Sequence, residues 1–98
     1  MPISVDQKKY LRGLLHAIKP VVIIGQNGLT ENVNAEIDAA LTYHELIKIK
    51  ISAERDERET IVAAICEQHN ADRVQYIGKM LSLYKRNKQK PRITLPKP

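Results

Sequence analysis

The sequence predicts one α/β domain, a sandwich with element order α-β-α-β-α-β-β around a four-stranded mixed sheet. Two observations carry this prediction. Helical and extended apolar periodicities alternate along the chain, and 98 residues with 43% hydrophobic content leave room for a single core. We assign residues 1–86 to this domain and treat residues 87–98 as a basic, proline-containing C-terminal tail.

The first helix and the first strand are separated by a proline. Ser4 can cap the helix, with Gln7 as its capping-box partner three positions later. Pro20 moves Lys19 out of helical geometry and is expected to end the helix. Residues 21–24 are an unbroken β-branched run, which predicts a strand buried on both faces.

A second helix and a second strand follow the glycine-containing turn at residues 25–28. Thr30 is a good N-cap for the helix, whose inward side is predicted to consist of Val33, Ile37, Ala40 and Leu41. Residues 46–52 alternate with period two, which predicts a strand with one core face and one partly wet face. Because a helix joins the two strands, we expect them to be parallel.

The third helix is expected to begin near Asp56, with Glu59 completing a capping-box-like pair. Its inward stripe is predicted to consist of Ile61, Val62, Ile65 and Cys66. Asn70 can close the helix in a left-handed conformation.

A hairpin is predicted after the third helix. Residues 73–77 and 80–84 read as strands joined tightly through residues 78–79. Residues 93–95 either add a short edge strand or belong to a mobile tail.

The charge of the chain is concentrated at its C-terminal end. Residues 1–70 hold 8 Lys and Arg against 10 Asp and Glu, whereas residues 71–98 hold 8 Lys and Arg against one Asp. Such asymmetry favours a polyanionic partner, because cations placed near phosphates release condensed counterions. A basic tail that only keeps the protein soluble is the alternative.

Several classes of protein are not expected. Cys66 is the only cysteine, which rules out an internal disulfide. The first residues do not resemble a secretory signal, and no segment reaches the roughly 20 apolar residues of a membrane span. We therefore expect a cytoplasmic protein without a membrane partner. With four Tyr, no Phe and no Trp, base stacking on several exposed rings is poorly supported.

The candidate functional motif is Gly25-Gln26-Asn27-Gly28, between a predicted strand and a predicted helix. Two glycines let a phosphate backbone approach main-chain N–H groups, and the helix start adds a partial positive charge. This is the logic of a GxxG clamp on single-stranded RNA. A plain strand-to-helix turn is the alternative, and a nucleotide P-loop is excluded because no Gly-Lys-Ser/Thr follows.

Basic residues flank this motif in the predicted topology. Their ordinary role is as solvated surface charges, but we predict that they converge with the loop on a shared RNA-binding surface. These residues are Lys8, Arg12, Lys19, Lys48, Lys50, Lys79, Lys85 and Arg86.

Three stretches of the chain together resemble a known family. The first comprises residues 11–14, 16, 19–22 and 24–30, the second residues 44–50, and the third residues 74–79 and 83–85. In this order they resemble a YhbY-type CRM domain, where CRM stands for chloroplast RNA splicing and ribosome maturation. The resemblance covers about residues 4–86.

The resemblance implies a fold like the C-terminal domain of the third bacterial translation initiation factor. It also implies binding of ribosomal RNA in precursors of the large ribosomal subunit, through the GxxG loop and neighbouring basic residues. Lys85 stands where the family commonly has Arg, which keeps the charge but loses the bidentate geometry. Gln26 stands where many members have Lys, so this loop relies more on backbone donors.

Other functions are weighed against this prediction. Cys66 and His69 have a spacing used by metal ligands, but no second pair has ligand spacing, so neither a metal nor another cofactor is expected. His44 is expected to cap or pack, and no catalytic set stands out. We therefore predict a non-catalytic, monomeric RNA-binding protein without a small-molecule substrate. The alternative is a protein-interaction module on the ribosome with an incidental basic tail. DNA binding is not expected, because the sequence shows no helix-turn-helix signal.

Overall fold

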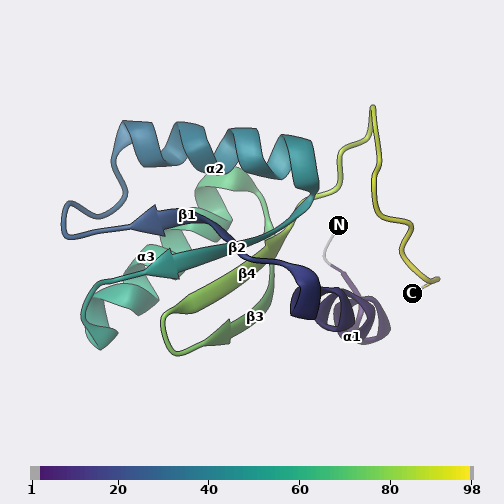
Figure 1. Ribbon diagram of the computed structural model, residues 1–98, viewed down its shortest axis with the longest axis horizontal. Helices are drawn as coiled ribbons and strands as arrows, with labels where there is room; N and C mark the ends of the chain where they lie inside the picture. The colour runs from purple at the N-terminus through teal and green to yellow at the C-terminus, as the bar shows by residue number, and fades with distance from the viewer. Residues whose placement is uncertain (1–2, 98) are drawn as a thin grey trace.

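Four strands form one mixed sheet in the computed structural model, which describes residues 3–97 (Figure 1). In sheet order β1-β2-β4-β3, β1 is parallel to β2, and the other neighbours are antiparallel. The strands are β1 (Pro20–Ile24), β2 (Leu46–Ile51), β3 (Asp72–Ile77) and β4 (Met80–Tyr84). The predicted α/β fold, element order and mixed sheet are confirmed.

The helices are α1 (Val5–Leu14), α2 (Glu31–His44) and α3 (Arg55–His69), and a short 3₁₀ turn, Leu15–Ala17, extends α1. In Figure 1, α2 and α3 lie over the sheet, whereas α1 lies at one end of it. Side chains of α2 and α3 share the main core with the sheet, so both cover its first face. On the second face, α1 covers only the end at Leu46 and Tyr84.

Alternation along β2 divides the buried residues between two clusters. Ile47, Ile49 and Ile51 contact the main core beneath α2 and α3, as predicted. Leu46 points the other way and joins a smaller cluster formed with α1. The members of this smaller cluster are Leu11, Leu15, Leu46, Val74 and Tyr84.

Several predicted helix boundaries are confirmed by their hydrogen bonds. Ser4 and Gln7 form the reciprocal capping box of α1. The Thr30 hydroxyl accepts the Val33 N–H at the start of α2. Asn70 ends α3 with φ 51° and ψ 46°, the left-handed conformation that asparagine tolerates.

The predicted burial of the first strand on both faces is wrong. Val22 and Ile24 are buried, but Val21 is 48% and Ile23 is 64% exposed. The reason is that β1 is an edge strand whose second face is left open, because α1 covers only the opposite end of the sheet. A run of β-branched residues therefore predicts a strand but does not predict whether one or both faces of that strand are buried.

Two other boundaries also differ from prediction. Glu54 is the N-cap of α3 and its side chain makes no capping bond, so the Asp56 capping box is wrong and Asp56 lies in the first turn. The first helix tightens to 3₁₀ geometry at Leu15 and gives way to extended backbone at Ile18, before Lys19.

The C-terminal tail is held against the domain by one buried carboxylate. Glu45 is fully buried, and its Oε1 accepts the backbone N–H groups of Arg92 at 2.6 Å and Ile93 at 2.7 Å. Its Oε2 accepts the Asn87 N–H at 2.7 Å. Residues 93–95 form no strand, but Ile93 and Leu95 pack against the smaller cluster.

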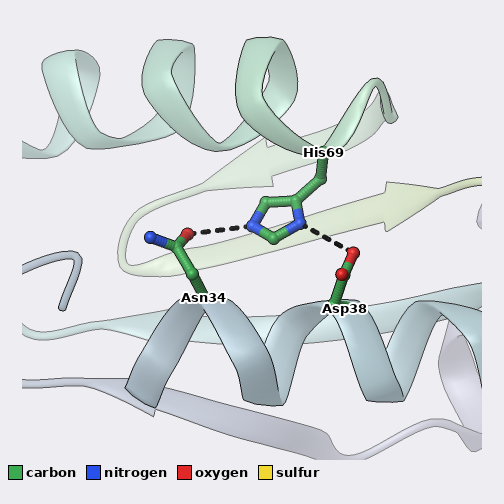
Figure 2. Close-up of polar contacts among 3 residues, drawn as sticks. All are labelled: Asn34, Asp38 and His69. Carbon is green, nitrogen blue, oxygen red and sulfur yellow. Dashed lines mark hydrogen bonds and ion pairs between the residues drawn. The ribbon is translucent and has the colours of Figure 1, made fainter. Parts of the chain in front are cut away.

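A polar cluster ties α2 to α3 beside the main core (Figure 2). His69 is buried at the end of α3, and its Nε2 lies 2.9 Å from Asn34 Oδ1. Its Nδ1 lies 3.3 Å from Asp38 Oδ1, also on α2. Both ring nitrogens thus lie within hydrogen-bond distance of side chains of α2, which gives His69 a structural role.

Among residues 3–97, no helix has the length and the apolar character needed to cross a membrane.

Candidate nucleic-acid interface

The Gly25–Gly28 segment forms a tight turn between β1 and α2. The Gly28 N–H donates to the Gly25 carbonyl at 3.1 Å, which closes a β-turn with Gln26 and Asn27 at its centre. Gly28 has a φ of 70°, and its carbonyl accepts the Thr30 N–H at 3.1 Å. Thr30 then caps α2, so the turn is fixed directly before the helix start.

Two amide donors of this turn remain available. Within the described residues, the N–H groups of Gln26 and Asn27 donate to no other protein group. Both residues are exposed. The Gly28 N–H is already used in closing the turn, so the set of free backbone donors is smaller than the GxxG motif implies.

Gly25 has no structural reason within the domain to be glycine. Its φ does not lie in the left-handed region, and a Cβ added there would meet no atom within 4 Å. The missing side chain therefore leaves the approach to the turn open from outside.

Lys50 and Lys79 are brought to the same end of the sheet as the turn, which we call the loop end. Lys50 pairs with Ile23 of β1, one residue before Ile24. The Ile51 N–H donates to the Lys79 carbonyl at 2.7 Å, which fixes the β3–β4 turn beside the end of β2. Both lysines are exposed.

The second face of the sheet is uncovered next to the loop end, and we call this area the open face. One row across the four strands contains Ile23, Lys50, Met80 and Ile77. Lys48 lies two residues from Lys50 on the same side and pairs with Pro20. The exposed Lys19 directly precedes Pro20 and is therefore close to this pair. The open face therefore combines cations with exposed apolar side chains, including Val21 and Ile77.

The remaining predicted site residues lie at the far end, where β2 begins and β4 ends. Lys85 and Arg86 follow Tyr84, which pairs with Leu46. Lys8 and Arg12 are on α1, which packs over the same end. The length of β2 separates this group from the loop by roughly 17 Å. The sequence-predicted residues thus form two groups rather than one cluster around the turn.

Within the described residues, the Lys and Arg side chains of the predicted interface form no salt bridge. Between residues 3 and 97, the one contact of a basic side chain with a carboxylate within 4 Å is that of the His69 ring with Asp38, at 3.3 Å. No Lys or Arg there forms a salt bridge with a carboxylate, so their charges remain available to an anionic partner.

The role of Glu45 in holding the tail is not predicted from the sequence. Its partners lie 42 to 48 residues away along the chain. A local signal does exist, because Glu45 follows a helix directly and has a φ of 65°, a position where glycine or asparagine is usual. A glutamate there indicates a side chain with a specific partner.

The side chains that could ligate a metal are dispersed among residues 3–97. In the part of the chain that the structure describes, no three His, Cys, Asp or Glu side chains are grouped to hold a metal. Burial raises the pKa of the Cys66 thiol, which disfavours the reactive thiolate. His44 ends α2 and is exposed, with its ring edge-on to Tyr43 at 4.7 Å.

Known proteins resemble this chain along nearly its whole length. It is 47% identical over 96 residues to an RNA-binding protein of Haemophilus influenzae, covering 97% of this chain and 96% of that protein. A probable RNA-binding protein of Pseudomonas aeruginosa is also 47% identical, over 89% of this chain and 85% of its own length. The probable RNA-binding protein YqeI of Bacillus subtilis is 34% identical over 92% of this chain and 95% of its own length.

A solved structure shares the fold. The solution structure of a Staphylococcus aureus hypothetical protein, described as a candidate RNA-binding protein, matches with a TM-score of 0.80 and 35% identity. The match covers 96% of this chain and 99% of that one. The family model described as the CRS1/YhbY (CRM) domain matches residues 3–85. The chain therefore belongs to the CRS1/YhbY (CRM) domain family.

Proposed function

We propose that this chain is a non-catalytic RNA-binding protein that grips the backbone of single-stranded RNA with its Gly25–Gly28 turn. The observation that carries the proposal is the pair of unused amide donors at Gln26 and Asn27, directly before the start of α2. Free backbone N–H groups close to a helix start attract phosphate, because each carries a partial positive charge and the N-terminal end of the helix dipole adds to it. The names of the curated relatives support RNA as the ligand.

Cations of the loop end strengthen this grip. Lys50 and Lys79 lie beside the turn, and neither is paired with a carboxylate. Lys48 and Lys19 extend the positive charge along the open face. The Asn27 side chain is exposed at the centre of the turn, where it can hydrogen-bond a base or a sugar.

The far-end group serves a longer RNA. Lys8, Arg12, Lys85 and Arg86 lie roughly 17 Å from the turn, too far for one phosphate but suited to a strand that crosses the sheet. Each contact of this kind adds affinity without sequence preference.

The proposed partner is ribosomal RNA in precursors of the large ribosomal subunit. The resemblance to YhbY-type CRM domains supports this partner. We further propose that the protein acts in the cytoplasm as a monomer, without a cofactor and without a small-molecule substrate.

A protein-interaction module on the ribosome is the second candidate, and the open face favours it. Ile23 and Ile77 are each 64% exposed, which is unusual for isoleucine in a small sheet. Salt separates the two candidates, because phosphate binding weakens steeply as salt rises and an apolar interface does not.

The test is RNA binding by a variant with Gln26→Asp and Asn27→Asp, measured by fluorescence anisotropy on a single-stranded RNA. We expect a folded protein whose affinity falls at least about tenfold, because two carboxylates repel phosphate at the turn. The matched control is Ala63→Glu with Gln68→Glu, two exposed positions on α3 that add the same charge beyond the opposite face. Equal affinity of the two variants would contradict the proposal.

A further inference from the structure

Tyr43 is the most exposed aromatic residue among residues 3–97, and it lies away from the Gly25–Gly28 turn. It lies in the last turn of α2 and is 61% exposed, whereas Tyr84 is buried and Tyr76 packs against the main core. Tyr10, on α1, is 45% exposed. An aromatic ring left in water next to basic residues is a common feature of surfaces that bind unpaired bases.

Arg92 of the tail lies over this ring. Its guanidinium carbon is 4.6 Å from the centre of the Tyr43 ring, within cation–π distance. His44 completes the arrangement, with its ring edge-on to Tyr43. We call Tyr43, His44 and Arg92 the Tyr43 platform.

The tail is fixed so that Arg92 stays in place. The Arg92 N–H and the Ile93 N–H both donate to Glu45 Oε1. The Asn87 side chain donates to the Thr42 carbonyl on α2 at 2.9 Å. Its Oδ1 accepts the N–H groups of Gln89 and Lys90, which shapes the basic turn of the tail. The backbone that carries the guanidinium is therefore preorganised, and binding does not have to order it.

A hollow of about 510 Å³ opens beside the platform, between the exposed side of α2 and the tail. Asp38 and Thr42 line it from α2, and Lys90 and Arg92 from the tail. A lysine supplies charge for a phosphate, while the carboxylate and the hydroxyl can pair with the edge of a base.

We propose that the Tyr43 platform stacks one unpaired base of a bound RNA, with the adjacent phosphate near Lys90. The inference rests on the proposed function, because it takes RNA as the ligand. The platform is distinct from the Gly25–Gly28 turn. The 14 residues of α2 separate the two by roughly 20 Å. A single strand that follows α2 therefore has one contact to its backbone and one to a base.

The experiment measures anisotropy of a labelled oligoadenylate of about 12 nucleotides with the full chain and four single variants. Tyr43→Ala is expected to lower affinity roughly 5- to 150-fold, the cost of losing one stacked base. Tyr43→Phe should bind like the parent chain. Arg92→Lys keeps the charge but loses the planar group, and it should lose several-fold. Tyr10→Ala, the other exposed tyrosine, is the matched control and should have little effect.

A second readout separates stacking from charge. The fluorescence of an RNA carrying 2-aminopurine should be quenched by the parent chain and by Tyr43→Phe but not by Tyr43→Ala. The slope of log affinity against log salt should be the same for all three chains. Tyr43→Ala binding within twofold of the parent, or Tyr10→Ala losing as much, would overturn the platform. If Gln26→Asp with Asn27→Asp still lowers the affinity at least about tenfold in that case, the proposed function stands. If the parent chain binds no RNA, both proposals fail.

Discussion

At the scale of single residues, the two glycines of the turn have different physical roles. Gly28 adopts a φ of 70°, which a side chain would strain, whereas Gly25 has an ordinary φ and open space around it. The sequence shows only that both positions hold glycine. It predicts the turn but cannot say which glycine shapes the backbone and which leaves room for a ligand, because that distinction depends on the dihedral angles.

Alanine at these two positions should therefore separate stability from binding. Gly28→Ala is expected to lower the free energy of unfolding by about 1–2 kcal/mol, the cost of a left-handed residue with a Cβ. Gly25→Ala should leave stability within about 0.5 kcal/mol and lower RNA affinity about fivefold, since one backbone contact is lost. Urea titration and anisotropy measure the two effects. A Gly25→Ala chain that binds RNA normally would remove this glycine from the interface.

Cys66 gives a prediction that depends on pH. Burial raises the pKa of its thiol above the ordinary 9.0; Arg73 opposes this rise and Asp72 adds to it. Since the folded pKa exceeds the unfolded one, the stabilising contribution of the neutral thiol is complete below about pH 9 and is lost as pH rises through the folded value. Iodoacetamide should react more slowly with the native chain than with the chain in urea. Equal rates at the same mildly alkaline pH would contradict this assignment.

At the scale of elements, locally encoded features are predictable and long-range ones are not. The Ser4–Gln7 box, the alternation along β2 and the Asn70 cap each depend on residues within a few positions, and all three were predicted. The exposure of β1 depends instead on where α1 packs. The sequence does not decide whether the tail forms a strand or a mobile segment, because the anchor of the tail is Glu45, 42 or more residues earlier.

Glu45 and the tail should be energetically coupled. In the full chain, Glu45→Gln removes a charged acceptor from three backbone donors, and we expect it to cost about 2–4 kcal/mol of unfolding free energy. In a chain ending at residue 86, the same substitution should cost less than about 1 kcal/mol, because the donors are gone. Urea unfolding of the four chains forms a double-mutant cycle. Additive effects would show that the tail does not depend on this carboxylate.

At the scale of the whole molecule, charge and coverage divide the surface. One face of the sheet lies under α2 and α3. The other leaves Lys50 exposed beside the Gly25–Gly28 turn, with half-buried Lys48 further along the same face. The sequence predicted these basic residues individually. It could not show that they form two groups, because the position of α1 over the far end follows from packing rather than from any local pattern.

This division predicts which lysines contribute to the salt dependence of binding. Lys50→Ala should reduce the slope of log affinity against log salt by roughly 0.7, the value for one lost phosphate contact on a single strand. Lys9→Ala, at an exposed position of α1 outside both groups, should leave the slope unchanged. If both variants change the slope equally, binding reflects net charge rather than a defined surface.

The most direct test of the central claim is crosslinking in cells followed by RNA sequencing. It compares the parent chain with the Gln26→Asp, Asn27→Asp variant at matched expression. We predict crosslinks concentrated on precursors of large-subunit ribosomal RNA, and their loss in the variant while the protein remains folded. Crosslinks scattered over all RNA, or unchanged in the variant, would contradict a defined ribosomal RNA partner gripped by the Gly25–Gly28 turn.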